Sequence, residues 1–148
     1  EISACLVGSE MCIRDSVCLD QQYSRVNTPQ SVLELAQSCN HGNLQDHELK
    51  LRLHRALFGQ QMWDKRCDTL SGGERMRLCL CSLMIANHVP DLFVLDEPTN
   101  NLDLSSLAIL TRTVRNYRGT LLVVSHDDNF TREIGITRTV GLESPPAE

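Results

Sequence analysis

The second half of the chain alternates between unbroken apolar runs and apolar residues at helical spacing. Residues 92–95 and 121–124 are unbroken apolar runs, which are typical of buried strands. Apolar residues at helical spacing predict helices at residues 72–86 and 105–117. A short helix is expected after Asp127, followed by a last strand around residues 138–142. Because strands this apolar that alternate with helices are usually parallel and covered on both faces, the sequence predicts an α/β fold.

The first half predicts one short strand followed by helices. The strand candidate is residues 17–19, and Thr28 with Pro29 is expected to cap and begin a helix through residues 30–38. A second helix is expected within residues 43–58, from apolar residues at i, i+4, i+7 and i+8: Leu49, Leu53, Ala56 and Leu57. The later helix at residues 72–86 is expected to present one apolar face: Met76, Leu80, Leu83 and Met84. We expect Trp63 to be a packing residue.

Composition and charge limit the class of protein. The 148 residues fit one domain or a large piece of a bigger protein. With 14 basic and 19 acidic side chains, the net charge of −5 gives no general attraction for nucleic acid, although a local basic patch remains an alternative. No apolar stretch approaches the ~20 residues that span a bilayer, and no secretory signal pattern is present. These features predict a cytoplasmic protein with no direct membrane span.

The cysteines do not predict a disulfide scaffold or a metal site. There are seven of them, an odd number, and none form a C-x-x-C pair. We expect reduced thiols, several of them in apolar runs. His41, His47 and His54 are expected on the surface or on helix faces rather than as ligands.

Residues 1–16 fit the rest of the chain poorly. They show no clear period, and the stretch "CLVGSEMCIRDS" resembles a translated sequencing-adapter tail. We therefore expect residues 1–16 to be a non-native segment, the alternative being a genuine short strand and turn.

Two carboxylates, Asp96 and Glu97, directly follow the apolar run 92–95. Adjacent carboxylates at the end of a buried strand are costly unless they pair with a cation or act on a ligand. We expect Asp96 to hold Mg²⁺ through its water shell, and Glu97 to accept a proton from, or orient, an attacking water. The alternative is a strand that simply ends in solvated charge, which the following "PTNNLD" disfavours.

Two further polar side chains are expected at the same edge of the sheet. His126 follows the run 121–124, and Gln21 follows the first strand candidate. In parallel sheets, ligands sit beyond the carboxyl ends of the strands. The amide of Gln21 could reach the metal or its water, although the adjacent Gln22 leaves this assignment open. A convergent polar site is therefore expected.

The stretch "LSGGE", residues 70–74, precedes the helix at residues 72–86. Ser71 followed three residues later by Glu74 predicts a capping box. Backbone N–H groups at such a helix start, with Gly72 and Gly73 beside them, attract a phosphate.

In this order and spacing, these stretches resemble the ATP-binding cassette (ABC) nucleotide-binding domain. The resemblance covers residues 17–143 and implies part of a P-loop NTPase-like parallel sheet with an α-helical signature subdomain. It implies that residues 70–74 are the signature motif, residues 92–97 the Walker B strand and residues 101–103 the D-loop. It also implies that Gln21 is the Q-loop glutamine and His126 the switch histidine.

The resemblance implies an ATPase that uses ATP and Mg²⁺. Its catalytic residues would be Glu97 and His126, and its metal contacts Asp96 and Gln21. The residues that it implies for nucleotide binding are Ser71, Gly72, Gly73, Glu74, Gln21 and Asp103.

Three stretches narrow the resemblance: "DEPTNNLD", "LDQQYS" and "RGTLLVVSHDDNF". They resemble the ABC-F proteins, soluble twin-cassette ATPases of which many act on ribosomes. "IGITRTVGLE" resembles the last strand of the second cassette in bacterial members. The expected partners are a second cassette, in the same full-length chain or in a dimer, and the ribosome.

The chain departs from the family pattern because it contains no G-x-x-x-x-G-K-[ST] sequence. We expect the C-terminal part of one cassette, with a helical subdomain at about residues 28–90, a core at about residues 91–143 and a tail at 144–148. In the family, ATP affinity rests largely on this missing glycine-rich loop and its lysine, so this piece is expected to be inactive alone. The signature motif of one cassette serves an ATP held by the facing cassette. The alternatives are a nucleotide-binding subunit of a membrane transporter and a non-catalytic scaffold with the same fold.

Overall fold

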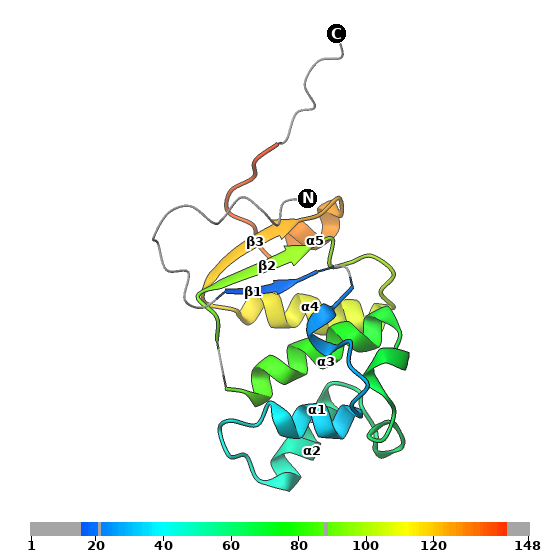
Figure 1. The fold of residues 1–148 in the computed structure, drawn as a ribbon. Helices are drawn as coiled ribbons and strands as arrows, with labels where there is room; N and C mark the ends of the chain where they lie inside the picture. The colour runs from blue at the N-terminus through cyan, green and yellow to red at the C-terminus, as the bar shows by residue number, and fades with distance from the viewer. Residues whose placement is uncertain (1–15, 21, 88, 142–148) are drawn as a thin grey trace, which may run out of the picture.

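The computed structural model describes residues 16–20, 22–87 and 89–141 (Figure 1). Its strands form one parallel sheet in the order β1-β2-β3, with the bounds β1 Ser16–Leu19, β2 Leu92–Asp96 and β3 Thr120–Val124. Val17 lies opposite Phe93, which in turn lies opposite Leu121. The predicted α/β fold with a parallel sheet is confirmed.

Helices fill the two connections between the strands. Between β1 and β2 lie α1 Val32–Ser38, α2 Asp46–Arg55 and α3 Gly72–Ile85, together with the short 3₁₀ turns η1 Ser24–Val26, η2 Gln60–Met62 and η3 Cys67–Thr69. Beyond β2 lie α4 Leu104–Asn116 and, after β3, α5 Asp128–Glu133. The predicted helices are all present, with boundaries shifted by a few residues.

The start of α1 differs from the prediction. The helix begins at Val32 rather than at Pro29, because Ser31 caps it: the Glu34 amide donates to Ser31 Oγ at 3.2 Å. The Ser31 amide donates in return to Glu34 Oε2 at 2.8 Å. Thr28 is not the cap, since this reciprocal pair already satisfies two of the donors at the helix start.

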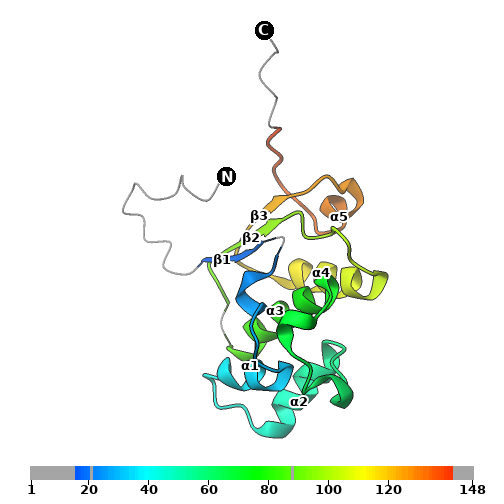
Figure 2. The same ribbon diagram turned by 45° about the vertical axis from the view of Figure 1, so that its right-hand side comes forward.

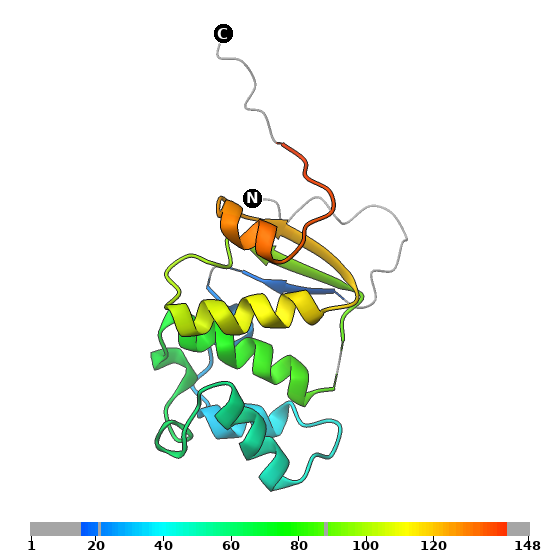
Figure 3. The same cartoon turned by 180° about the vertical axis from the view of Figure 1, so that it is seen from behind.

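The elements stack in layers below the sheet. Figures 1 and 2 show α4 and α3 beneath the sheet, with α1 and α2 on the far side of α3. Figure 3, from behind, shows α4 and α5 on the same side of the sheet. Leu19 and Leu95 of the sheet join Leu110 of α4 and Phe130 of α5 in one buried cluster.

Helix α3 is more deeply buried than predicted. Its buried side chains include Leu78, Cys79 and Cys81, which lie outside the single apolar face that the sequence predicts. Met84, predicted on that face, is 44% exposed. The reason is that α3 is packed between α4 and the pair α1 and α2, so it is covered from several sides.

One face of the sheet is open, which corrects the prediction that both faces are covered. Cys18, Val94 and Leu122 lie opposite one another across the three strands and share this face. Cys18 is exposed, Leu122 is 53% exposed and Val124, two residues further, is 41% exposed. Within the part of the chain that the structure describes, the helices cover only the opposite face.

The prediction of a last strand around residues 138–142 is wrong for the residues that the structure describes. Residues 138–141 form no strand, and Leu142 lies outside the described residues. Residues 1–15 of the predicted non-native segment lie outside them too, while Ser16 begins β1. Trp63 is a packing residue, as predicted: it packs partly buried against the core and donates from Nε1 to the Phe58 carbonyl at 3.1 Å.

Candidate functional site

The sheet brings the carboxyl ends of β2 and β3 together. Asp96 is the last residue of β2 and lies opposite Val124, the last residue of β3. The Glu97 amide donates to the Val124 carbonyl at 2.8 Å, so the backbone pairing continues one residue past the strand. Glu97 and His126 therefore leave neighbouring strands at one edge, as the sequence predicts.

Glu97 and His126 form a close pair. The imidazole Nε2 of His126 lies 3.2 Å from Oε1 of Glu97, where the carboxylate side chain is 11% exposed and the imidazole 97% exposed. Oε1 is buried and accepts no aligned hydrogen bond from any described residue. A buried carboxylate oxygen with an unused lone pair can accept a proton from a bound water.

The backbone of Glu97 is strained. Its φ of 46° lies in the left-handed region, where a non-glycine residue costs of order 1–3 kcal/mol. Two hydrogen bonds hold this conformation. The Glu97 amide donates to the Val124 carbonyl, and in the following turn the Asn100 amide donates to the Glu97 carbonyl at 3.2 Å.

Asp96 lies next to Glu97 in the sequence but on the open face of the sheet. It pairs with Val124 of β3, whose side chain is on that face. Asp96 is partly buried. No group of three or more His, Cys, Asp or Glu residues that could hold a metal ion occurs among the described residues. A single carboxylate suits Mg²⁺, which commonly keeps waters and completes its shell with substrate phosphates.

The signature stretch forms the capped start of α3. The Ser71 amide donates to Glu74 Oε2 at 2.8 Å, and the Glu74 amide donates to Ser71 Oγ at 3.3 Å. The predicted capping box is confirmed. Lys65 also reaches Glu74 Oε2, at 3.2 Å. Glu74 is therefore already engaged in holding the helix start.

The charge of Glu74 is stabilised in this position. Burial alone would raise its pKa, but the hydrogen bonds from Ser71 and the contact with Lys65 lower the pKa below its ordinary value. The carboxylate is therefore ionised at neutral pH and completes the cap.

The two signature glycines lie in different surroundings. Gly72 is exposed, and a Cβ atom there would meet no described atom within 4 Å. Gly73 is buried against Ser106 at the start of α4. Gly72 thus leaves an open approach to the helix start, whereas Gly73 allows two helices to come close.

Asp103 caps α4 at this junction. Its Oδ1 accepts from the Ser106 amide at 2.9 Å, and hydrogen bonding from Ser106 lowers the pKa of this carboxyl. The same oxygen lies 3.7 Å from the Cβ position of Gly73. The fold therefore joins the predicted D-loop residue to the signature stretch, through Ser106, which the sequence analysis missed.

The predicted site residues fall into two groups. Asp96, Glu97 and His126 form one, at the edge of the sheet; Ser71, Gly72, Gly73, Glu74 and Asp103 form the other, at the starts of α3 and α4. No hydrogen bond or ion pair joins the two groups among the described residues. Gln21 lies outside the described residues.

A family model described as ABC transporter matches residues 8–100, a range that includes the signature stretch, β2 and Glu97. The chain therefore belongs to the ABC transporter family, the family of ATP-binding cassettes. The match also includes residues 8–16 of the segment predicted to be non-native, whose origin stays a prediction.

Two relatives place the chain within the family. It is 37% identical over 113 residues to the Energy-dependent translational throttle protein EttA of Haemophilus influenzae. The aligned region covers 75% of this chain and 19% of the relative. The chain is 40% identical over 96 residues to ABC transporter F family member 5 of Arabidopsis thaliana, 65% of this chain and 13% of the relative. These matches confirm the predicted ABC-F resemblance, and the chain spans less than a fifth of either relative's length.

A solved structure confirms the fold. The ATP-binding cassette MJ0796, in a dimeric post-hydrolysis state bound to ADP and Pi, superposes with a TM-score of 0.59 at 21% identity. The superposition covers 80% of this chain and 55% of the cassette. The three-stranded sheet and its helices are thus part of a P-loop NTPase-like fold. No helix among the described residues is long and apolar enough to cross a membrane.

Proposed function

We propose that this chain is part of an ABC-F ATPase that binds and hydrolyses ATP between two cassettes. The observation that carries the proposal is the pair formed by Glu97 and His126, with a buried carboxylate oxygen 3.2 Å from an exposed imidazole nitrogen at the carboxyl edge of a parallel sheet. Ligands of such sheets bind at this edge.

Glu97 is the proposed general base. Its Oε1, which accepts no aligned hydrogen bond from a described residue, takes a proton from a water as the water oxygen forms a bond to the γ-phosphorus of ATP. The bond between that phosphorus and the bridging oxygen breaks, and the electron pair leaves with ADP. The exposed imidazole of His126 can turn about its side-chain bonds, so it can donate from Nε2 and orient the carboxylate or the γ-phosphate.

Asp96, with its partly buried carboxylate on the open face, is the residue of this group that would hold Mg²⁺, together with Gln21. The ion would neutralise phosphate charge when bound. Asp96 lies one residue before the proposed base, so both carboxylates stand at the same strand end.

The signature group serves a second site in this proposal. Ser71 and the exposed N–H groups around Gly72 would contact the γ-phosphate of an ATP held by a facing cassette. Glu74 would hold the helix start through its bonds to Ser71 and Lys65, and Asp103 would fix α4 against it. The expected partner is therefore a second cassette, in the same full-length chain or in a dimer.

The 148 residues contain no G-x-x-x-x-G-K-[ST] stretch, so we propose that this piece alone does not hydrolyse ATP. Calorimetry of the 148-residue chain with Mg-ATP is expected to show no micromolar binding. A cytoplasmic location and action on the ribosome rest on the similarity to EttA, whose name describes a translational throttle.

A glutamine at position 97 tests the proposal. In the full-length protein, Glu97→Gln keeps the size of the side chain but removes the base, and turnover is expected to fall by ~10²–10⁴. ATP-driven association of the two cassettes is expected to persist. Glu133→Gln, on the exposed end of α5, is the matched control and should turn over normally. Undiminished turnover by Glu97→Gln would assign the base elsewhere.

The second candidate function is the nucleotide-binding subunit of a membrane transporter, which the description of the family model favours. It predicts copurification with a membrane protein. The ABC-F proposal instead predicts sedimentation with ribosomes when ATP hydrolysis is blocked by Glu97→Gln. Sedimentation through sucrose in the presence of ATP separates the two.

A further inference from the structure

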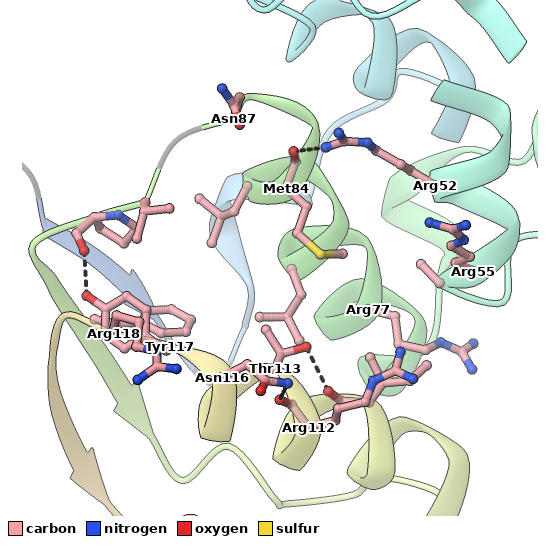
Figure 4. Close-up of a pocket in the computed structure, with 17 residues that line it drawn as sticks. Arg52, Arg55, Arg77, Met84, Asn87, Arg112, Thr113, Asn116, Tyr117 and Arg118 are labelled. Atoms are coloured by element: carbon pink, nitrogen blue, oxygen red, sulfur yellow. Dashed lines mark hydrogen bonds between the residues drawn. The ribbon is translucent and has the colours of Figure 1, made fainter. Parts of the chain in front are cut away.

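A groove lined by five arginines lies between α2, α3 and α4 (Figure 4). We call it the arginine groove; its volume is about 690 Å³. The arginines come from four segments: α2, α3, α4 and the turn that leads to β3. They are Arg52, Arg55, Arg77, Arg112 and Arg118. No carboxylate lines the groove among the described residues.

These arginines form no ion pair with a carboxylate among the described residues, although Arg77 lies near enough to Asp103 to help lower the pKa of that carboxyl. Arg52 donates from Nη1 to the Met84 carbonyl. Arg77 is the most informative, because its side chain is only 8% exposed and its Nε has no hydrogen-bond partner among the described residues. The Arg77 guanidinium lies over the Phe58 ring, 5.7 Å from the ring centre, and its unpartnered Nε would gain from an incoming anion.

The floor of the groove is apolar. Leu83 and Ile109 are partly buried there, and Met84 is 44% exposed. Exposed apolar atoms of this kind are stabilised when another apolar surface covers them, and methionine adapts its shape to what covers it. The groove therefore combines apolar side chains with positively charged ones.

We propose that the arginine groove binds an acidic, amphipathic helical segment of a partner protein. Leucine-like side chains of that helix would cover the floor, and its carboxylates would pair with the arginines, which present planar forks suited to carboxylates. The charge complementarity is one-sided, since the lining has five cations and no anion among the described residues.

The same lining offers no open aromatic face on which single-stranded bases could stack. Single-stranded bases need open aromatic faces to stack on. Of the two aromatic rings that line the groove, Phe93 is buried, and Tyr117 packs edge-on against it at 5.6 Å and donates to the Pro90 carbonyl. Both rings are thus committed to the interior of the protein.

The arginine groove is separate from the nucleotide site. It lies where β2 begins, near Pro90 and Phe93, and where the chain enters β3, near Arg118. Glu97 and His126 follow the opposite ends of these strands. A partner can therefore occupy the groove while the carboxyl edge of the sheet holds nucleotide, and the inference stands independently of the proposed ATPase function.

Fluorescence anisotropy with a defined probe tests the proposal. The probe is a fluorescein-labelled 18-residue helical peptide with leucines at i, i+3, i+4 and i+7 spacing and glutamates at the other positions. The control peptide has lysines in place of the glutamates. The protein variants are Arg55→Glu combined with Arg112→Glu, and Met84→Gln for the floor. Arg115→Glu is the matched control, because Arg115 is exposed on α4 but does not line the groove.

The glutamate peptide is expected to bind the 148-residue chain, and its affinity should fall at least tenfold in the double arginine variant and severalfold in Met84→Gln. Arg115→Glu should leave affinity unchanged, and circular dichroism should show the same helix content in all variants. Absent binding, or equal binding of the lysine peptide, would overturn the proposal. So would tighter binding of a 20-residue uridine RNA that is lost in the double variant, which would make the groove a nucleic-acid site.

Discussion

The position that a Cβ atom would take on Gly73 lies 2.9 Å from Oγ of Ser106. Gly73 belongs to the start of α3 and Ser106 to the start of α4, so the glycine sets how closely the two helices approach. Oγ of Ser106 is buried and forms no aligned hydrogen bond with a described residue, although it lies close enough to Asp103 to help lower the pKa of that carboxyl. The contact with Gly73 is steric, and it joins the predicted signature stretch to the start of α4, just after the predicted D-loop.

Gly73→Ala is expected to destabilise the 148-residue chain by about 1–3 kcal/mol, because overpacking a filled contact forces side chains or backbone to move. Gly72→Ala is the control: its added methyl group meets no described atom within 4 Å, and the effect should be neutral or stabilising by roughly 0.4–1 kcal/mol. Urea denaturation gives both values. The combination Gly73→Ala with Ser106→Ala should recover part of the loss, whereas equal effects of the two alanines would contradict the contact.

Ser31→Ala is expected to cost about 1 kcal/mol of unfolding free energy, the usual effect of losing a helix cap. The serine accepts from the Glu34 amide at 3.2 Å, and the variant leaves that donor without its partner. Ser105→Ala is the matched control, since Ser105 is exposed on α4 and its side chain makes no hydrogen bond to a described residue. If both variants lose the same stability, Ser31 does not cap α1.

Stability is expected to fall at alkaline pH because of buried thiols. Burial raises the pKa of Cys79 and of Cys81 to about 12, and that of Cys67 to about 11, from an ordinary value of 9.0. Above pH 9 the unfolded chain loses these protons while the folded chain keeps them, so the unfolded state gains stability. Each thiol contributes a loss of up to about 1.4 kcal/mol per pH unit until the pH reaches its folded pKa.

Urea denaturation at pH 8 and pH 10 under reducing conditions measures this loss. Cys79→Ala lowers stability at both pH values through the lost packing, but its decline between them should be smaller than that of the wild type by one thiol's share. A decline of the same size in the variant would show that Cys79 does not titrate in this way.

The open face of the sheet predicts dye binding and self-association. Leu122→Lys should reduce the fluorescence of a bound hydrophobic dye and the fraction of oligomer in size-exclusion chromatography, because Leu122 is 53% exposed in the middle of β3. Leu51→Lys, on an exposed position of α2, is the control and should leave the dye signal unchanged. The open face is not the dye site if the two variants lose equal fluorescence.

The amino-acid sequence by itself determined the elements and the edge of the sheet that carries the site. The apolar runs at residues 92–95 and 121–124 became β2 and β3, since strands without polar residues are stable only when at least one face is buried. The capping box of Ser71 and Glu74 was predictable because it joins residues three apart. The placement of Glu97 and His126 at one edge followed from parallel topology.

The tertiary structure alone decided the contacts between segments far apart in the sequence. The close approach of Gly73 to Ser106 and the gathering of arginines from four segments depend on how α3 packs against α2 and α4, which no local pattern encodes. The exposed state of Leu122 and the burial of α3 on several sides depend on which segments cover them. Helix caps and the spacing of apolar residues depend on residues a few positions apart, so the sequence alone predicts them. Burial and close packing arise only when distant segments meet.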